Sequence, residues 1–190
     1  MSDMKRLVTT ICICIVTGFG SAVAHADGGS VEIRSADSEL VDGVHLADAR
    51  LQYQLSDRID EALAGGIALE FVMEFEIDRV RRWWLDGKID TVRVQHELRF
   101  DSVSERYSLR NLNTGQRRSY ATIFGALNAL GRVDNLPLID ATLLEPDGRY
   151  RVAMRAGVSI SEYPVSLRYL LFWRNDWRVN SNQVTWLLDR

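Results

Sequence analysis

Residues 67–101 read IALEFVMEFEIDRVRRWWLDGKIDTVRVQHELRFD, and this stretch decides the fold class. From residue 67 to residue 78, apolar side chains alternate with side chains that are mostly acidic, which is the period-2 pattern of a half-buried strand. Asp86-Gly87 is a residue pair typical of hairpin turns. The alternation resumes in a return strand, whose apolar face carries Val92, Val94, His96, Leu98 and Phe100. The stretch therefore predicts a long antiparallel hairpin with one apolar and one charged face.

A two-residue turn at Asp86-Gly87 would set the register of this hairpin. The cross-strand pairs would be Phe75 with Leu98, Met73 with Phe100 and Glu74 with Arg99, the last as an ion pair. The same register would place Arg79 and Arg81 on the apolar face, opposite Val94 and Val92. We therefore predict a β-bulge near Asp78 to Val80, because one extra residue there restores apolar pairing.

Outward from this hairpin, short alternating segments continue in both directions. Further strands are predicted at residues 31–34, 45–53, 107–109, 138–144, 150–160 and 184–188. Two short helices are predicted, one capped by Ser56 and ending at Gly65-Gly66, the other capped by Ser119 and ending at Gly131. A third could run from Pro164 to Leu171. The pattern is typical of a mainly β protein, an antiparallel β-sandwich or half-barrel with two or three short helices.

The first 26 residues have the layout of a secretory signal peptide. Lys5 and Arg6 precede an apolar run that is richest at residues 11–16, and Ala24-His25-Ala26 forms a small-residue cleavage site. We expect residues 1–26 to be removed and residues 27–190 to form a single β-rich domain in the periplasm. The alternative is an uncleaved segment that serves as an N-terminal anchor.

The composition of the remaining chain narrows the classes of function. Both cysteines, Cys12 and Cys14, lie in the signal, so residues 27–190 can form neither a disulfide nor a thiol-based metal site. Removing Lys5, Arg6 and Asp3 leaves 21 basic and 25 acidic side chains, a net charge of −4. A nucleic-acid binder usually has a basic balance, so we expect no nucleic-acid partner.

The search for catalytic motifs finds none that is specific. His45 and His96 fall in different predicted strands, without the spacing of a metalloprotease helix, and no phosphate loop or nucleophile elbow occurs. His96 lies on the apolar face of its strand and reads as a satisfied core or rim histidine. The acidic row Glu70, Glu74, Glu76 and Asp78 reads as a solvated strand face rather than a cation site. We expect no cofactor and no metal, and the absence of these motifs favours a non-catalytic protein.

The most conspicuous surface candidate is the Arg/Trp tip, which we define as Arg79, Arg81, Arg82, Trp83 and Trp84. Strand parity places Trp83 and Trp84 on opposite faces, so at least one of them should be partly exposed. Tryptophan beside arginine is common at protein interfaces and at lipid headgroups. The alternative is that one tryptophan covers the sandwich end with an arginine stacked on it. A second cluster, residues 172–178, is expected to pack Trp173 and Trp177 over the core.

Five short segments together carry a family resemblance. They are Ala62-Leu63 with Gly66-Ile67, Arg82-Trp83-Trp84, Leu112-Asn113-Thr114-Gly115, Ala129-Leu130-Gly131-Arg132 and Asn175-Asp176-Trp177-Arg178. In their order and spacing the chain resembles a proteobacterial family of small exported proteins known as a domain of unknown function (number four-three-nine-zero). The resemblance covers most of residues 27–190 and implies a Gram-negative envelope location. It implies no activity, cofactor or catalytic residue.

These observations favour a non-catalytic binding or accessory module of the bacterial envelope that acts through the Arg/Trp tip. Its partner would be an envelope protein or the membrane surface. Two alternatives stay open. One is a hydrolase or carbohydrate-processing enzyme with a site assembled in space, for which Glu74, Glu76 and Asp101 are the suspects. The other is a binder of a lipid or apolar ligand between the sheets.

Overall fold

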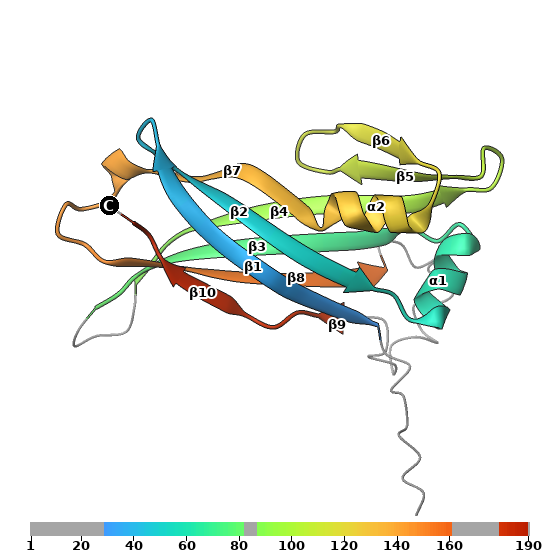
Figure 1. The fold of residues 1–190 in the computed structure, drawn as a ribbon, viewed down its shortest axis with the longest axis horizontal. Coiled ribbons are helices and arrows are strands. Elements are labelled where there is room, and N and C mark those ends of the chain that lie inside the picture. Colours follow the sequence, from blue (N-terminus) through green and yellow to red (C-terminus); the bar gives the residue numbers. More distant parts are fainter. Residues whose placement is uncertain (1–28, 82–86, 161–178, 190) are drawn as a thin grey trace, which may run out of the picture.

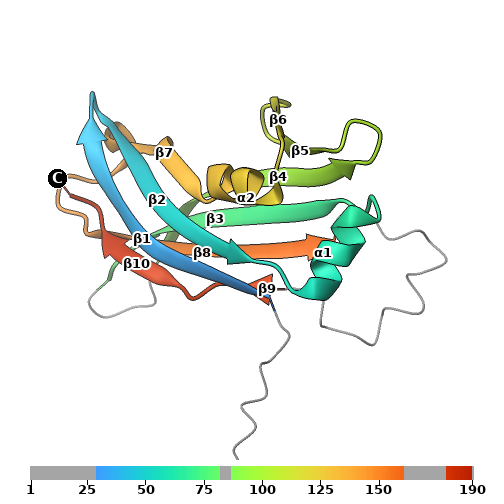
Figure 2. The same ribbon diagram turned by 45° about the vertical axis from the view of Figure 1, so that its right-hand side comes forward.

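The computed structural model describes residues 29–81, 87–160 and 179–189, which form two antiparallel sheets and two α-helices (Figures 1 and 2). The strands are β1 (Ser30–Val41), β2 (Val44–Gln54), β3 (Leu69–Arg79), β4 (Gly87–Asp101), β5 (Arg106–Asn111), β6 (Arg117–Tyr120), β7 (Arg132–Asp140), β8 (Tyr150–Ile160), β9 (Val179–Asn180) and β10 (Val184–Leu187). The helices are α1 (Asp57–Ala64), α2 (Ile123–Leu130) and a short 3-10 turn, η1 (Ala141–Leu143).

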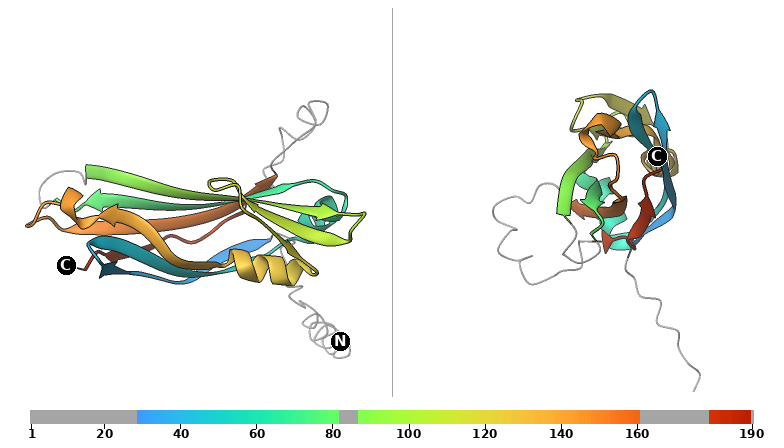
Figure 3. Two further views of the ribbon diagram at one scale, coloured as in Figure 1. Left: turned by 90° about the horizontal axis from the view of Figure 1, so that it is seen from above. Right: turned by 90° about the vertical axis from the view of Figure 1, so that its left-hand side faces the viewer.

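The two sheets face each other as the layers of a sandwich, which is plain in the end-on view (Figure 3). The smaller sheet has the order β1-β2-β7, and the larger has the order β10-β8-β3-β4-β5-β6, with β9 paired to β8. The predicted fold class, mainly β with antiparallel sheets and two short helices, is confirmed. The segment expected to form a third helix, Pro164 to Leu171, lies outside the described residues.

Strand β3 lies at the centre of the larger sheet, paired on one side with β4 and on the other with β8. Its inward side chains are at most 1% exposed, and they are Leu69, Phe71, Met73, Phe75 and Ile77. The smaller sheet packs against this face through inward residues of β2, and the Tyr53 ring meets Phe71 edge-on, with ring centroids 5.2 Å apart. The apolar residues of the alternating pattern thus lie in the core, and the residues between them lie on the outer face of the sheet.

The predicted register of the β3–β4 hairpin is wrong. Phe75 pairs with Val92, Met73 with Val94 and Glu74 with Arg93, a shift of six residues along β4. The reason is the connection: β3 ends at Arg79, which pairs with Gly87, so no two-residue Asp-Gly turn joins the strands. An irregularity does occur between Ile77 and Asp78, at the edge of the predicted region, but the extra residue is Ile89 in β4.

Hydroxyl caps fix where both α-helices begin. The Ser56 side chain accepts from the Ile59 N–H at the start of α1, as predicted. The predicted cap of the second helix is wrong, because Ser119 lies in β6 and the Thr122 side chain instead accepts from the Gly125 N–H. Within the described ranges, neither helix is long and apolar enough to cross a membrane.

Two strands differ in extent from the prediction. β1 continues to Val41 through the polar run that follows Ile33, with a register shift between Ile33 and Ser35. β7 covers Arg132–Asp140 instead of residues 138–144, and η1 takes up residues 141–143. Both errors have one cause: these strands carry bulges or lie at sheet edges, where period-2 alternation lapses.

The sandwich is closed along one side and open along the other. On the closed side the Trp186 indole N–H donates to the Ser38 hydroxyl at 2.8 Å, and the Ile33 N–H donates to the Asn182 side chain at 3.0 Å, so β1 lies beside β10. On the other side, α2 lies between β7 and the β5–β6 hairpin (Figure 1). Helix α2 therefore spans the gap that direct strand pairing would otherwise close.

Gly131 fixes the position of α2 and the start of β7 against β2. A Cβ at this residue would lie 2.3 Å from the backbone oxygen of Leu51, whose N–H donates to the Gly131 carbonyl at 2.8 Å. Gly65 ends α1 with the same φ and ψ, −72° and 2°, but a Cβ there would meet only its own helix, at 3.3 Å. Gly65 is therefore a suitable control position for a substitution of Gly131.

We predict that Gly131→Ala lowers the free energy of unfolding by about 1 to 3 kcal/mol, because backbone atoms must move apart to admit the methyl group. Gly65→Ala should change it by about 1 kcal/mol or less. Urea denaturation of both variants and the wild type checks this. Equal stability of the two variants would contradict the role assigned to the contact with Leu51.

Candidate functional site

Of the Arg/Trp tip, the structure describes Arg79 and Arg81. We call these residues, with Val80 between them, the root of the tip. At the end of β3, the Arg79 guanidinium forms an ion pair with Glu145 through both carboxylate oxygens, and the Val80 N–H donates to the Arg149 carbonyl at 2.8 Å. Arg81 is exposed, and Arg82, Trp83 and Trp84 lie outside the described residues. The cluster at residues 172–178 lies outside them too. The structure thus holds the root of the tip against the β7–β8 connection.

The acidic row forms an ion-pair ladder on the outer face of the larger sheet. Arg93 contacts Glu74 at 2.6 Å, Arg155 contacts Glu76 at 3.0 Å and Arg151 contacts Asp78 at 3.5 Å. The hydrogen bond from Arg93 is the main reason why the pKa of Glu74 is lowered. The charged face is therefore as predicted, although the partner of Glu74 is Arg93 rather than Arg99.

Of the three carboxylates suspected of catalysis, Glu74 and Glu76 lie on the same face of β3, whereas Asp101 lies at the end of β4. Glu74 and Glu76 belong to the ladder on β3, and each already contacts a basic side chain. Asp101 ends β4 and accepts the N–H groups of Val103 and Ser104, which lower its pKa. These carboxylates therefore hold a sheet face and a turn in place.

A different set of residues forms a recess on the open side of the sandwich, which we call the side cleft. Its volume is about 320 Å³. Buried apolar residues of β3, β5 and β7 form its floor, namely Met73, Leu109 and Val133. Half-buried and exposed residues complete the wall: Val94, His96, Asn111, Gln116, Arg118, Tyr120, Ala129, Arg132, Asp134 and Leu136.

Hydrogen bonds fix the tautomer of His96 in this cleft. The Asn111 Oδ1 atom accepts the N–H groups of Asn113 and Thr114, each at 2.9 Å, so its amide nitrogen must face the other way. That nitrogen lies 3.3 Å from His96 Nε2, which therefore accepts and carries no proton. The neutral ring must hold its proton on Nδ1, which is buried and has no hydrogen-bond partner among the described residues. His96 is an inward residue, as predicted, but it is not satisfied.

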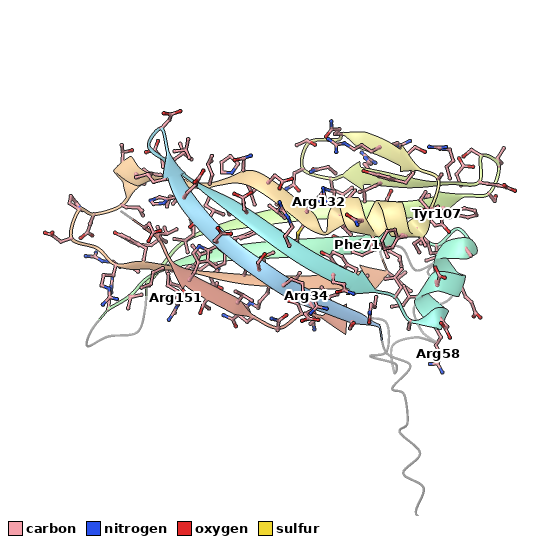
Figure 4. The ribbon with its side chains drawn as sticks, viewed as in Figure 1. Arg34, Arg58, Phe71, Tyr107, Arg132 and Arg151 are labelled. Carbon is pink, nitrogen blue, oxygen red and sulfur yellow. The ribbon has the colours of Figure 1, made fainter. Side chains whose placement is uncertain are left out.

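Two arginines of the cleft wall have no ion-pair or hydrogen-bond partner within the described ranges, and they are Arg118 of β6 and Arg132 of β7. Arg132 lies where β7 leaves α2 (Figure 4). The one carboxylate that lines the cleft, Asp134, is engaged by Arg50 at 2.7 Å. The cleft therefore combines an apolar floor with an excess of positive charge and of hydrogen-bond donors.

Two other recesses are less suited to binding a ligand. One of about 390 Å³ lies on the far side of Arg132, but Arg34 in its wall already donates to Glu32 and Gln52, and Arg50 to Asp134. Another, of about 130 Å³, surrounds His45, whose pKa is lowered by burial. It is smaller than ordinary small-molecule sites. In the described part of the chain, no group of three or more metal-ligating side chains is placed to hold a metal ion.

Little in the sequence points to the side cleft. The pattern predicts His96 as a satisfied core or rim histidine, and Arg118 and Arg132 belong to strands that are distant along the chain. One signal was present: the segments Leu112-Asn113-Thr114-Gly115 and Ala129-Leu130-Gly131-Arg132, quoted above for the resemblance, lie at this side. Asn113 donates to the Arg93 carbonyl and accepts the Gln95 N–H, which secures the β5–β6 turn to β4 beside the cleft.

We predict that His96 makes the protein less stable in acid. Burial lowers the pKa of His96 below its ordinary value of 6.5, so the unfolded chain binds a proton more readily than the folded one. The free energy of unfolding should therefore fall as the pH drops below about 6.5. In His96→Gln this fall should be smaller, by up to about 1.4 kcal/mol per pH unit.

Denaturation curves at several pH values between 5 and 8.5 measure this effect. The two proteins should show parallel pH dependence above about pH 7.5, where His96 no longer titrates. Parallel dependence down to pH 5 as well would contradict the assignment.

Comparison with known proteins identifies the family. The family model described as Domain of unknown function (DUF4390) matches residues 29–187, which include both sheets and both helices. No curated protein and no solved structure gives a match. The resemblance expected from the five segments is thus confirmed, and the chain belongs to the DUF4390 family, a domain of unknown function.

Proposed function

We propose that this protein is a non-catalytic binding or accessory module that acts in the bacterial envelope. The observation that carries the proposal is the side cleft, a recess between the two sheets whose wall holds two arginines without partners in the described ranges. Small-molecule sites commonly combine an apolar lining with a few polar groups that fix orientation. The envelope location rests on the signal-like layout of residues 1–26.

The chemistry of the cleft wall favours binding over catalysis. His96 Nε2 faces the Asn111 amide, so the lone pair that could remove a proton from a substrate is occupied. The guanidinium groups of Arg118 and Arg132 are donors only, and Asp134 is paired with Arg50. These groups can hold an acceptor in place, but none of them is ready to act as a general base.

Filling the cleft should abolish ligand retention. Ala129 lies in the cleft wall near the end of α2, so Ala129→Phe places a ring in the space that a ligand would take. Ala64→Phe is the matched control, because Ala64 is an exposed residue at the end of the other eight-residue helix. Native mass spectrometry of each protein, isolated from envelope fractions, should show a bound small molecule in the wild type and in Ala64→Phe only.

Equal retention by Ala129→Phe and Ala64→Phe would contradict binding in the cleft. Circular dichroism and a thermal melt of each variant establish that the sandwich is intact before the comparison is made.

A second candidate site for the same module is the Arg/Trp tip, which would contact an envelope protein or the membrane surface. In support, Glu145 and the Arg149 carbonyl hold Arg79 and Val80, so the tip begins at a strand end that is fixed in place. Residues that are fixed in advance lose less conformational entropy on binding than free residues do.

Trp83→Ala/Trp84→Ala should weaken partner capture and leave folding nearly intact. Crosslinking followed by affinity capture from envelope fractions compares this variant with the wild type, and Ala129→Phe serves as a control that leaves the tip unchanged. An unchanged partner list would refute the tip as the contact site. Loss of the cooperative melt would instead support tryptophans that cover the end of the core.

A further inference from the structure

We propose that the side cleft binds a small amphiphile that carries an oxyanion, either a carboxylate or a phosphate. Arg118 and Arg132 would bind the oxyanion, and the apolar floor would receive the tail. This inference rests on the proposed binding function and assigns that site a chemical class of ligand. Four features of the structure support it.

The first feature is that Arg118 and Arg132 lack ion-pair partners in the described ranges. Most basic side chains of the larger sheet are engaged, as in the ladder of Arg93, Arg151 and Arg155 with acidic residues of β3. Arg118 lies opposite Leu109, a buried residue, so it belongs to the inward face of the β5–β6 hairpin. Unpaired guanidinium groups beside a buried apolar floor favour an anion, to which arginine donates two hydrogen bonds in a fixed geometry.

The second feature is the direction of the hydrogen bonds. The His96 tautomer that Asn111 enforces leaves an N–H group at Nδ1 without an acceptor. This N–H is buried, so the donors that face the cleft are the two guanidinium groups, while the carboxylate of the cleft is held by Arg50. A ligand with acceptor oxygens matches this wall, whereas an ammonium group would meet like charge and donors only.

The third feature is the volume of the cleft. At about 30 Å³ for each water-sized group, the cleft volume of about 320 Å³ corresponds to roughly ten non-hydrogen atoms. Octanoate has this size. Met73 and Leu109 in the floor are buried, so a tail that reaches them leaves water and gains hydrophobic stabilisation.

The fourth feature is that the cleft is preformed. β7 pairs with β2 through two register shifts, contains Pro137, and holds Asn135 in the left-handed region at φ 52°. The free edge of such a strand cannot pair with the larger sheet, because its N–H and C=O groups are neither regular nor complete. The two sheets therefore stay apart at β7, and a ligand enters without prior separation of strands.

The test uses four ligands that share one tail and differ in the head: octanoate, octyl phosphate, octanol and octylammonium. They are titrated by calorimetry into the full protein isolated from envelope fractions and dialysed. We expect octanoate, octyl phosphate or both to bind, octanol to bind about tenfold more weakly or worse, and octylammonium not to bind. Acetate, which has the head without the tail, should bind far more weakly than octanoate.

Substitutions separate the cleft from charge in general. Arg118→Gln/Arg132→Gln should weaken octanoate binding about tenfold or more, because the oxyanion loses both charged donors. The matched control is Arg110→Gln/Arg117→Gln on the same hairpin, where the two residues pair with each other and Arg110 lies opposite Glu97 of the outer face. This control removes the same charge and should leave affinity unchanged. If the first double variant melts early, the two single variants replace it.

Two results would overturn the inference. If octanol binds as tightly as octanoate, Ala129→Phe abolishes that binding, and Arg118→Gln/Arg132→Gln does not, the oxyanion is wrong but the binding function stands. If none of the four ligands binds, the oxyanion inference fails. The proposed function fails with it only when Ala129→Phe and Ala64→Phe also retain the same co-purified molecules.

Discussion

The structure depends on the burial of one face of β3. Leu69, Phe71, Met73, Phe75 and Ile77 are almost fully buried, and β3 pairs along its whole length with both neighbours, so it is the central strand of the larger sheet. Its outer face can be acidic because each neighbour supplies arginine: β4 gives Arg93, and β8 gives Arg151 and Arg155. Without the inward face there is no core, and without the basic neighbours the outer face would repel itself.

The second sheet covers this core but does not close around it. On one side, the Trp186 indole N–H donates to β1 and the Asn182 side chain accepts from β1, which holds β1 beside the larger sheet. On the other side, the bulges and the proline of β7 prevent pairing, and α2 spans the gap, tied to β2 by the Gly131–Leu51 hydrogen bond. The side cleft thus follows from backbone irregularity in a single strand. Bulges commonly occur near functional sites for this reason.

The sequence predicted features that depend on local patterns and missed those that depend on distant contacts. Alternation located β2, β3 and β8, and the Ser56 cap located α1, because each is set within a few residues. The β3–β4 register was wrong since it depends on the length of the connection, and Gly87 pairs with Arg79. Binding of a ligand between the sheets was an open alternative, but the residues of the cleft were missed, because they come together only after five strands and a helix have packed.

One polar group of the side cleft carries a cost in stability. The buried His96 N–H has no acceptor among the described residues, whereas almost every outer-face carboxylate of β3 is matched with a base. Local conflicts of this kind are expected at functional sites, where a ligand completes the interactions that the chain leaves open. An oxyanion in the cleft would supply a counter-charge to Arg118 and Arg132. In this proposal, the side of the sandwich that strand pairing does not close is the side that receives the ligand.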